Sequence, residues 1–150
     1  MLWGKATWYF FHSLIEKTND DLFSKNRIEI INLCKIILTN LPCPICRKHA
    51  NDYIIKNPIY GNKNKNELKL YFWKFHNFVN KRLNKKQFEE DSLKMYERDN
   101  FINICIYFFR CFCMKYGGRG LGIDIHIMIR RDLIQTIKSW LIENRKEYNI

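Results

Sequence analysis

Two cysteines separated by two residues carry the clearest chemistry in this sequence. Cys43 and Cys46 lie in the segment LPCPIC, where prolines stand on both sides of Cys43. Proline is tolerated in the first turn of a helix but not in its interior, so Cys43 should lie at or just before a helix N-terminus. The partial positive charge there stabilises a thiolate, and the spacing allows a readily reversible disulfide. The pair therefore predicts a thiol–disulfide redox centre.

Two other interpretations of this pair are weaker. Cys43, Cys46 and His49 have a spacing typical of zinc ligands, but no second ligand pair stands nearby in the sequence. A thioredoxin-like or glutaredoxin-like site requires a strand before the motif, whereas residues 27–41 carry apolar side chains at a helical period. We therefore expect a redox pair without metal.

Aromatic and polar side chains recur on one face of each of two predicted helices. Gly4, Trp8 and His12 follow each other at four-residue spacing, with Lys5 beside them. A later helix repeats side chains every three or four residues, namely Trp73, His76, Asn77, Asn80 and Leu83. Each histidine taken singly is more often an ordinary core or surface residue. Buried His and Asn need partners, however, so together the two faces favour a flat, polar ligand.

A basic cluster follows the second of these faces. It contains no acidic residue and consists of Lys81, Arg82, Lys85 and Lys86. A solvated helix end is the commoner meaning of such a run. The functional interpretation is a clamp for a pyrophosphate, which Lys and Arg bind through charge-assisted hydrogen bonds.

The elements that must position these residues are predicted to be helices. Apolar side chains at spacings of three and four predict helices over 7–17, 27–41, 43–56 and 67–83, and the apolar segment 101–116 is expected to be helical too. The polar segment 87–98 is also expected to be helical. After the glycine-rich stretch 117–122, residues 123–129 alternate like a strand, but the apolar residues that follow have a helical period, so we expect a helix there. The fold class is therefore all-α. A boundary near residues 98–100 divides the chain into a domain over 1–98 and a mostly helical C-terminal extension over 99–150.

Composition limits the class of protein further. The 150 residues are 47% hydrophobic, which excludes disorder as the main state, and the net charge of +11 favours polyanionic partners. No apolar run reaches the roughly 18 residues that span a bilayer, and the N-terminus lacks the pattern of a signal peptide. We expect a cytoplasmic protein with no membrane span. In a reducing compartment, its six cysteines indicate redox, metal-binding or buried thiols.

Three separated motifs resemble one known family. Residues 3–8, WGKATW, together with His12 match the pattern W-G-x-x-x-W-x-x-x-H, and residues 76–83, HNFVNKRL, match H-N-x-V-N-x-x-L. Between them, residues 41–50, LPCPICRKHA, are similar to an active-site segment of the same family. The chain resembles the Erv/ALR flavin-dependent sulfhydryl oxidases, most closely the small forms of large cytoplasmic DNA viruses. The resemblance covers Leu2 to about Arg98.

This resemblance implies a four- or five-helix bundle that binds FAD beside the cysteine pair. Cys46 would be the thiol next to the flavin, Cys43 the outer thiol that exchanges with substrate, and oxygen the final acceptor, giving hydrogen peroxide. Lys81 would help to bind the phosphates. The remaining cofactor-binding residues that it implies are Gly4, Lys5, Thr7, Trp8, His12, Cys46, Trp73, His76, Asn77, Val79, Asn80, Leu83, Lys85 and Tyr96.

The resemblance also implies partners and a location. The substrates would be protein dithiols, with a thioredoxin-like relay protein as one candidate, and the chain would be a homodimer. It would act on virion proteins in the host cytoplasm or in the virion. Cellular relatives have a structural disulfide that begins where Trp73 stands here, so we expect this bundle to be held by packing alone.

The other cysteines have two interpretations. Cys111 and Cys113 could act as a shuttle pair beside the glycine-rich stretch, or they could be two buried and inert thiols. Cys34 and Cys105 lie on apolar stripes and are expected in the core.

A rival interpretation from another class is a basic helical module that binds nucleic acid or serves in assembly, without catalysis. Charge alone gives only salt-dependent affinity without sequence preference, so we expect no nucleic-acid partner. The apolar residues of 101–116 also exceed what a lone helix needs, which favours an interaction surface in the C-terminal third.

Overall fold

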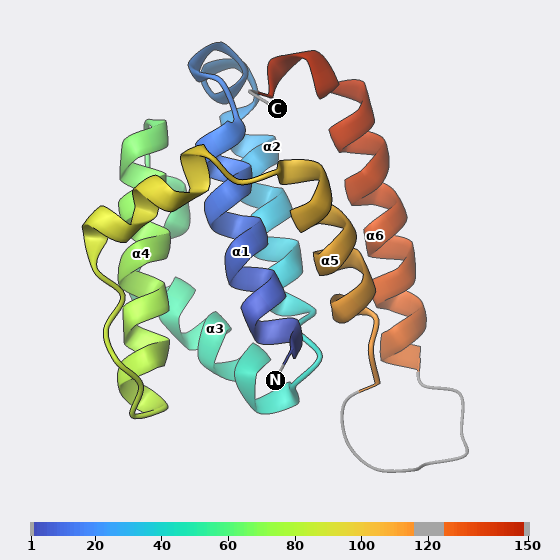
Figure 1. Cartoon of the computed structure of the whole chain (residues 1–150). Helices are drawn as coiled ribbons and strands as arrows, with labels where there is room; N and C mark the ends of the chain where they lie inside the picture. The colour runs from blue at the N-terminus through green and yellow to red at the C-terminus, as the bar shows by residue number, and fades with distance from the viewer. Residues whose placement is uncertain (1, 116–124, 149–150) are drawn as a thin grey trace.

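The computed structural model describes residues 2–115 and 125–148 (Figure 1). Its α-helices are α1 (Leu2–Lys17), α2 (Asp20–Thr39), α3 (Pro44–Lys56), α4 (Lys65–Arg82), α5 (Phe101–Phe112) and α6 (Ile125–Glu143). Three short 3₁₀ helices are η1 (Ile59–Gly61), η2 (Glu90–Glu97) and η3 (Arg145–Glu147). These ranges contain no strand, which confirms the all-α fold.

Several helix boundaries differ from the sequence prediction. α2 begins at Asp20 rather than 27, although its backbone leaves helical geometry at Asn26. The helix predicted over 87–98 is a shorter 3₁₀ helix, η2, and the one predicted over 101–116 ends at Phe112. The glycine-rich stretch 117–122 lies outside the described residues.

Asparagine side chains begin three of the helices. The side-chain oxygens of Asn19, Asn64 and Asn100 each accept a hydrogen bond from the backbone N–H three residues later, at 2.7, 2.9 and 2.9 Å. These bonds satisfy backbone donors that have no partner within a helix's first turn. Short polar side chains therefore fix where α2, α4 and α5 start.

α4 ends in a turn that reverses the chain. The backbone N–H of Lys85 donates to the carbonyl of Asn80 at 2.9 Å, and that of Asn84 donates to Lys81 at 3.3 Å. Asn84 has a φ of 52°, the left-handed conformation that this Schellman arrangement requires and that asparagine tolerates. The chain then runs back alongside α4 toward η2 (Figure 1).

α1 lies in the middle of the molecule. It packs against α4 and η2 on one side and against α5 on the other, while α3 packs against α2 (Figure 1). Phe10 of α1 stacks on Phe108 of α5, with ring centroids 4.3 Å apart. The buried side chains of α5 and α6 belong to the same hydrophobic cluster as those of α1 and α2. The functional division near residue 98 remains a prediction.

A buried arginine joins α6 to the end of α5. Arg130 is 2% exposed, and its Nε donates to the carbonyl of Phe112 at 2.8 Å. A cation at a helix C-terminus also interacts favourably with the helix dipole. Across residues 2–115 and 125–148, no helix is both long and apolar enough to cross a bilayer.

Candidate functional site

Cys43 and Cys46 form a disulfide at the N-terminus of α3, with their Cα atoms 5.1 Å apart. Cys43 is the N-cap residue, and its sulfur accepts a hydrogen bond from the backbone N–H of Cys46 at 3.2 Å. Pro44 occupies the first helical position, where its missing N–H costs nothing. The predicted placement of the pair is therefore confirmed. After reduction, the positive end of α3 would stabilise a thiolate here.

The two sulfurs differ in exposure. Cys43 is 3% exposed, whereas Cys46 is half-buried. If Cys43 were the outer thiol and Cys46 the inner one, Cys43 would be expected to be the more exposed of the two, whereas it is the less exposed. The assignment of the two roles remains a prediction.

His49, the third residue considered as a zinc ligand, bonds to the end of α4. Arg82 donates from Nη2 to His49 Nε2 at 2.7 Å, because a guanidinium can only donate. Burial, followed by the charges of Arg82 and Lys48, lowers the pKa of His49. The three candidate zinc ligands are thus engaged in a disulfide and in a bond to Arg82.

Five rings from α1, α4, η2 and the segment before η2 form what we call the ring cluster: Trp8, His12, His76, Phe88 and Tyr96. Trp8 and His76 stack almost in parallel, with centroids 4.2 Å apart and planes at 6°. His12 stacks on Tyr96 at 5.0 Å. The structure thus brings together four residues that the sequence analysis assigned to cofactor binding.

The two histidines of the ring cluster are joined by a hydrogen bond. His12 Nε2 lies 3.1 Å from His76 Nδ1. Burial, and then His76, lowers the pKa of His12 to about 3, while burial, and then Lys85, lowers that of His76 to about 4. Both imidazoles are therefore neutral at pH 7, so one ring donates and the other accepts.

Phe88 belongs to the site but was not predicted from the sequence. Its carbonyl accepts hydrogen bonds from Trp73 Nε1 at 2.7 Å and Asn77 Nδ2 at 2.8 Å, and its N–H donates to Asn77 Oδ1 at 2.7 Å. These hydrogen bonds tie the chain to α4 at Trp73, in a bundle whose cysteines other than Cys43 and Cys46 are free. One feature of the sequence could have indicated a buried role for Phe88: it is the one apolar residue in the polar stretch 84–92.

The remaining predicted cofactor residues are more scattered. Thr7 is buried, and its hydroxyl donates to the carbonyl of Trp3 within α1 at 2.7 Å. Val79 packs against the core and Asn80 is buried, whereas Leu83 is 57% exposed. The basic residues Lys5, Lys81 and Lys85 are exposed.

The residues present fit FAD on three observations. A Cβ added to Gly4 would meet nothing within 4 Å, so α1 leaves room on the face that carries Trp8. The buried indole N–H of Trp3 has no hydrogen-bond partner among the described residues. The ring cluster offers flat apolar surfaces, and Lys85, whose charge acts on His76, offers the kind of charge that a pyrophosphate requires.

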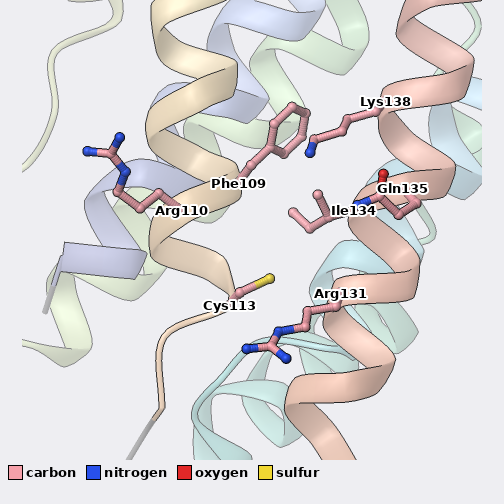
Figure 2. Close-up of a pocket in the computed structure, with 7 residues that line it drawn as sticks. All are labelled: Phe109, Arg110, Cys113, Arg131, Ile134, Gln135 and Lys138. Atoms are coloured by element: carbon pink, nitrogen blue, oxygen red, sulfur yellow. The ribbon is translucent and has the colours of Figure 1, made fainter.

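Cys113 lies apart from this site, at the end of α5. Its sulfur points into a pocket of about 310 Å³ between α5 and α6 (Figure 2). Burial raises the pKa of the Cys113 thiol, and the nearby Arg130, Arg131 and Lys138 only partly offset this. Cys111 is buried, and no disulfide joins it to Cys113. Cys34 and Cys105 are buried in the core, as predicted.

Comparison with known proteins agrees with these motifs. The model of the Erv1 / Alr family matches residues 5–100. A protein of African swine fever virus, from a Malawi tick isolate, is named FAD-linked sulfhydryl oxidase and is 33% identical over 105 residues, covering 70% of this chain and 87% of its own length. The protein of the same name from a Kenya pig isolate is 38% identical over 84 residues, covering 56% of this chain and 70% of its own.

A protein of Invertebrate iridescent virus 3 is 38% identical over 87 residues, which cover 57% of this chain and 59% of that protein. No solved structure matches the chain. The family match covers the cysteine pair and the whole ring cluster. The chain belongs to the Erv1/Alr family.

Proposed function

We propose that the protein is an FAD-linked sulfhydryl oxidase that forms disulfides in protein substrates. The observation that carries this proposal is the Cys43–Cys46 disulfide at the N-terminus of α3, in a chain whose viral relatives are named for that activity. The proposal needs a place for FAD, and the ring cluster with its neighbouring lysines has suitable chemistry.

The first half of the reaction takes place at the two sulfurs. A substrate thiolate attacks Cys43 Sγ, which breaks the Cys43–Cys46 bond and leaves the negative charge on Cys46 Sγ. That sulfur lies in the first turn of α3, where the positive end of the helix dipole favours a thiolate, while the backbone N–H of Cys46 itself donates to Cys43 Sγ. A second substrate thiolate then attacks the substrate sulfur of the mixed disulfide and releases Cys43. The substrate leaves oxidised, and the pair keeps two electrons as two thiols.

The two electrons kept by Cys43 and Cys46 would leave through FAD, whose isoalloxazine would supply the two-electron acceptor chemistry and the reaction with oxygen that gives hydrogen peroxide. The chain's own residues would bind and orient it: Trp8, His12, His76 and Tyr96 would pack against its rings, and Lys5, Lys81 and Lys85 would bind its phosphates. The His12–His76 pair is neutral, so it can hydrogen-bond to a ring without adding charge.

The test of this proposal is a visible absorption spectrum of the purified protein, followed by oxygen consumption with a small dithiol. We expect a flavin spectrum and a loss of oxygen consumption in both Cys43→Ala and Cys46→Ala, because either change removes the disulfide. Cys46→Ala should still bind FAD. A colourless protein that takes up no FAD, or activity retained in either variant, would refute the proposal.

We further propose protein dithiols as substrates, a homodimer as the working form, and action in the host cytoplasm or the virion. A shuttle role for Cys111 and Cys113 also remains a proposal. It predicts that Cys113→Ser slows oxidation of a protein substrate but not of a small dithiol. Equal rates of Cys113→Ser and wild type on both substrates would favour an inert thiol in the pocket of Figure 2.

A further inference from the structure

The segment between α4 and η2, residues 83–89, is here called the return segment, because it runs back alongside α4 (Figure 1). It begins at the left-handed Asn84, which reverses the chain at the end of α4. Its attachment to α4 is concentrated at Phe88. Both polar backbone groups of that residue are bonded to α4 side chains.

The side chains that hold Phe88 have little polar capacity left. The indole N–H is the only donor of Trp73, and it points at the Phe88 carbonyl. Asn77 uses its oxygen and one N–H on the same residue, at 2.7 and 2.8 Å. Such a two-point bond between an amide and a backbone fixes the orientation of Phe88 as well as its position. Trp73 and Asn77 therefore recognise the protein's own chain.

This attachment places the Phe88 ring among the histidines. Its centroid lies 5.2 Å from that of His76, 5.6 Å from His12 and 6.4 Å from Tyr96. Phe88 as a whole residue is half-buried. Phe88 thus reaches the ring cluster from a segment that has no regular secondary structure of its own.

We propose that Phe88 is a wall of the flavin site, and that Asn77 and Trp73 are positioning residues that act on the flavin through Phe88. This inference rests on the proposed function, since it concerns the same cofactor. It reassigns Trp73 and Asn77 from direct cofactor contacts to the support of a neighbouring ring.

Two measurements test it. The first is the dissociation constant for FAD, from the quenching of flavin fluorescence on binding. The second is hydrogen exchange of the Phe88 amide in flavin-free protein, which reports the attachment without any cofactor. The variants are Phe88→Ala, Phe88→Tyr, Asn77→Ala, Trp73→Phe and the double variant Asn77→Ala/Phe88→Ala. Asn66→Ala, an exposed asparagine on the same helix, is the matched control.

We expect Phe88→Ala to weaken FAD binding about tenfold, as the loss of one aromatic contact does, and Phe88→Tyr to restore it. Asn77→Ala should weaken FAD binding and speed exchange of the Phe88 amide about fivefold to tenfold, because that amide loses its acceptor. Trp73→Phe keeps the ring and loses one hydrogen bond, so its effects should be smaller and in the same direction. Trp73→Phe also tests the attachment of Phe88 if Asn77→Ala folds poorly. Asn66→Ala should match the wild type.

The double variant separates positioning from direct contact. If Asn77 acts through Phe88, removing both should weaken FAD binding no more than the stronger single change does. If the losses of FAD affinity in the two single variants multiply in the double variant, Asn77 binds FAD itself. If Phe88→Ala binds FAD as tightly as the wild type, Phe88 does not line the flavin site. Either result overturns this inference and leaves the proposed function standing. A wild-type protein that binds no FAD overturns the proposed function and this inference together.

Discussion

At the scale of single residues, the dominant electrostatic feature is a pair of neutral histidines inside the protein. His12 and His76 hydrogen-bond to each other in a site that opposes positive charge, and the folded protein takes up protons there only near pH 3 to 4. An unfolded chain protonates its histidines near pH 6.5. Since the unfolded state binds these protons first, acid favours unfolding.

We therefore expect the free energy of unfolding to be level above about pH 7.5 and to fall as the pH drops from 6.5 toward 4. At pH 5 each histidine of the pair should lower the free energy of unfolding by about 2 kcal/mol relative to pH 7.5. Urea unfolding at pH 7.5 and pH 5 measures this. His76→Asn should lose less stability between the two pH values than the wild type does, with the exposed His126→Asn as control. An equal loss of stability between pH 7.5 and pH 5 in all three proteins would contradict a role of the buried histidine pair in this pH dependence.

At the scale of elements, the reversal at the end of α4 decides whether the return segment reaches the ring cluster. Its geometry depends on Asn84 in the left-handed region and on the backbone bond from Lys85 to Asn80. A turn of this kind is a local device with a distant effect, because it sets the direction of the chain that carries Phe88. Its replacement should therefore change both stability and the ring cluster.

We expect Asn84→Ala to lower the free energy of unfolding by about 1 kcal/mol. The Cβ atom of alanine disfavours the left-handed conformation, and alanine lacks the polar side chain with which asparagine can hydrogen-bond to the nearby backbone. Asn84→Gly, which adopts that conformation freely, should stay close to the wild type. Denaturant unfolding of the three proteins is the measurement. Stability that is unaffected by alanine would show that the turn is not under conformational constraint.

The same elements show which features could be predicted from the sequence. The position of Cys43 at the start of α3 followed from the prolines around it, since the backbone limits of proline are local. Phe88 could not be placed that way, because its position depends on hydrogen bonds from Trp73 and Asn77, which are 15 and 11 residues away in the chain. The early start of α2, in contrast, had a local signal in the N-cap residue Asn19, which apolar periodicity does not use.

At the scale of the whole molecule, the C-terminal third packs onto α1 through aromatic side chains. Phe108 of α5 is fully buried and stacks on Phe10 of α1 at 4.3 Å, and Ile137 of α6 belongs to the same cluster. A shared core of this kind couples the folding of its parts. Removing residues 99–150 would expose the face of α1 that α5 covers.

We expect Phe108→Ala to lower the free energy of unfolding by about 3 to 5 kcal/mol, the usual cost of a cavity left by a buried phenylalanine. The change should lower the midpoint for the whole chain, including α1, as followed by circular dichroism and by hydrogen exchange in α1. The substitution Ile106→Ala, on the exposed side of α5, is the control. If unfolding occurred in two separate transitions and Phe108→Ala shifted only one of them, residues 1–98 would fold independently of the rest.

The attachment of the return segment has a consequence for the protein in a changing redox environment. It consists of hydrogen bonds, which a reductant does not break, and each cysteine other than Cys43 and Cys46 is free. The Cys43–Cys46 bond closes a loop of only two intervening residues, so it constrains the unfolded chain less than a disulfide between distant residues would. The covalent cross-link that reacts and the contacts that maintain the architecture are therefore separate. Repeated reduction and reoxidation of the pair can therefore proceed while the hydrogen bonds that hold the return segment stay in place.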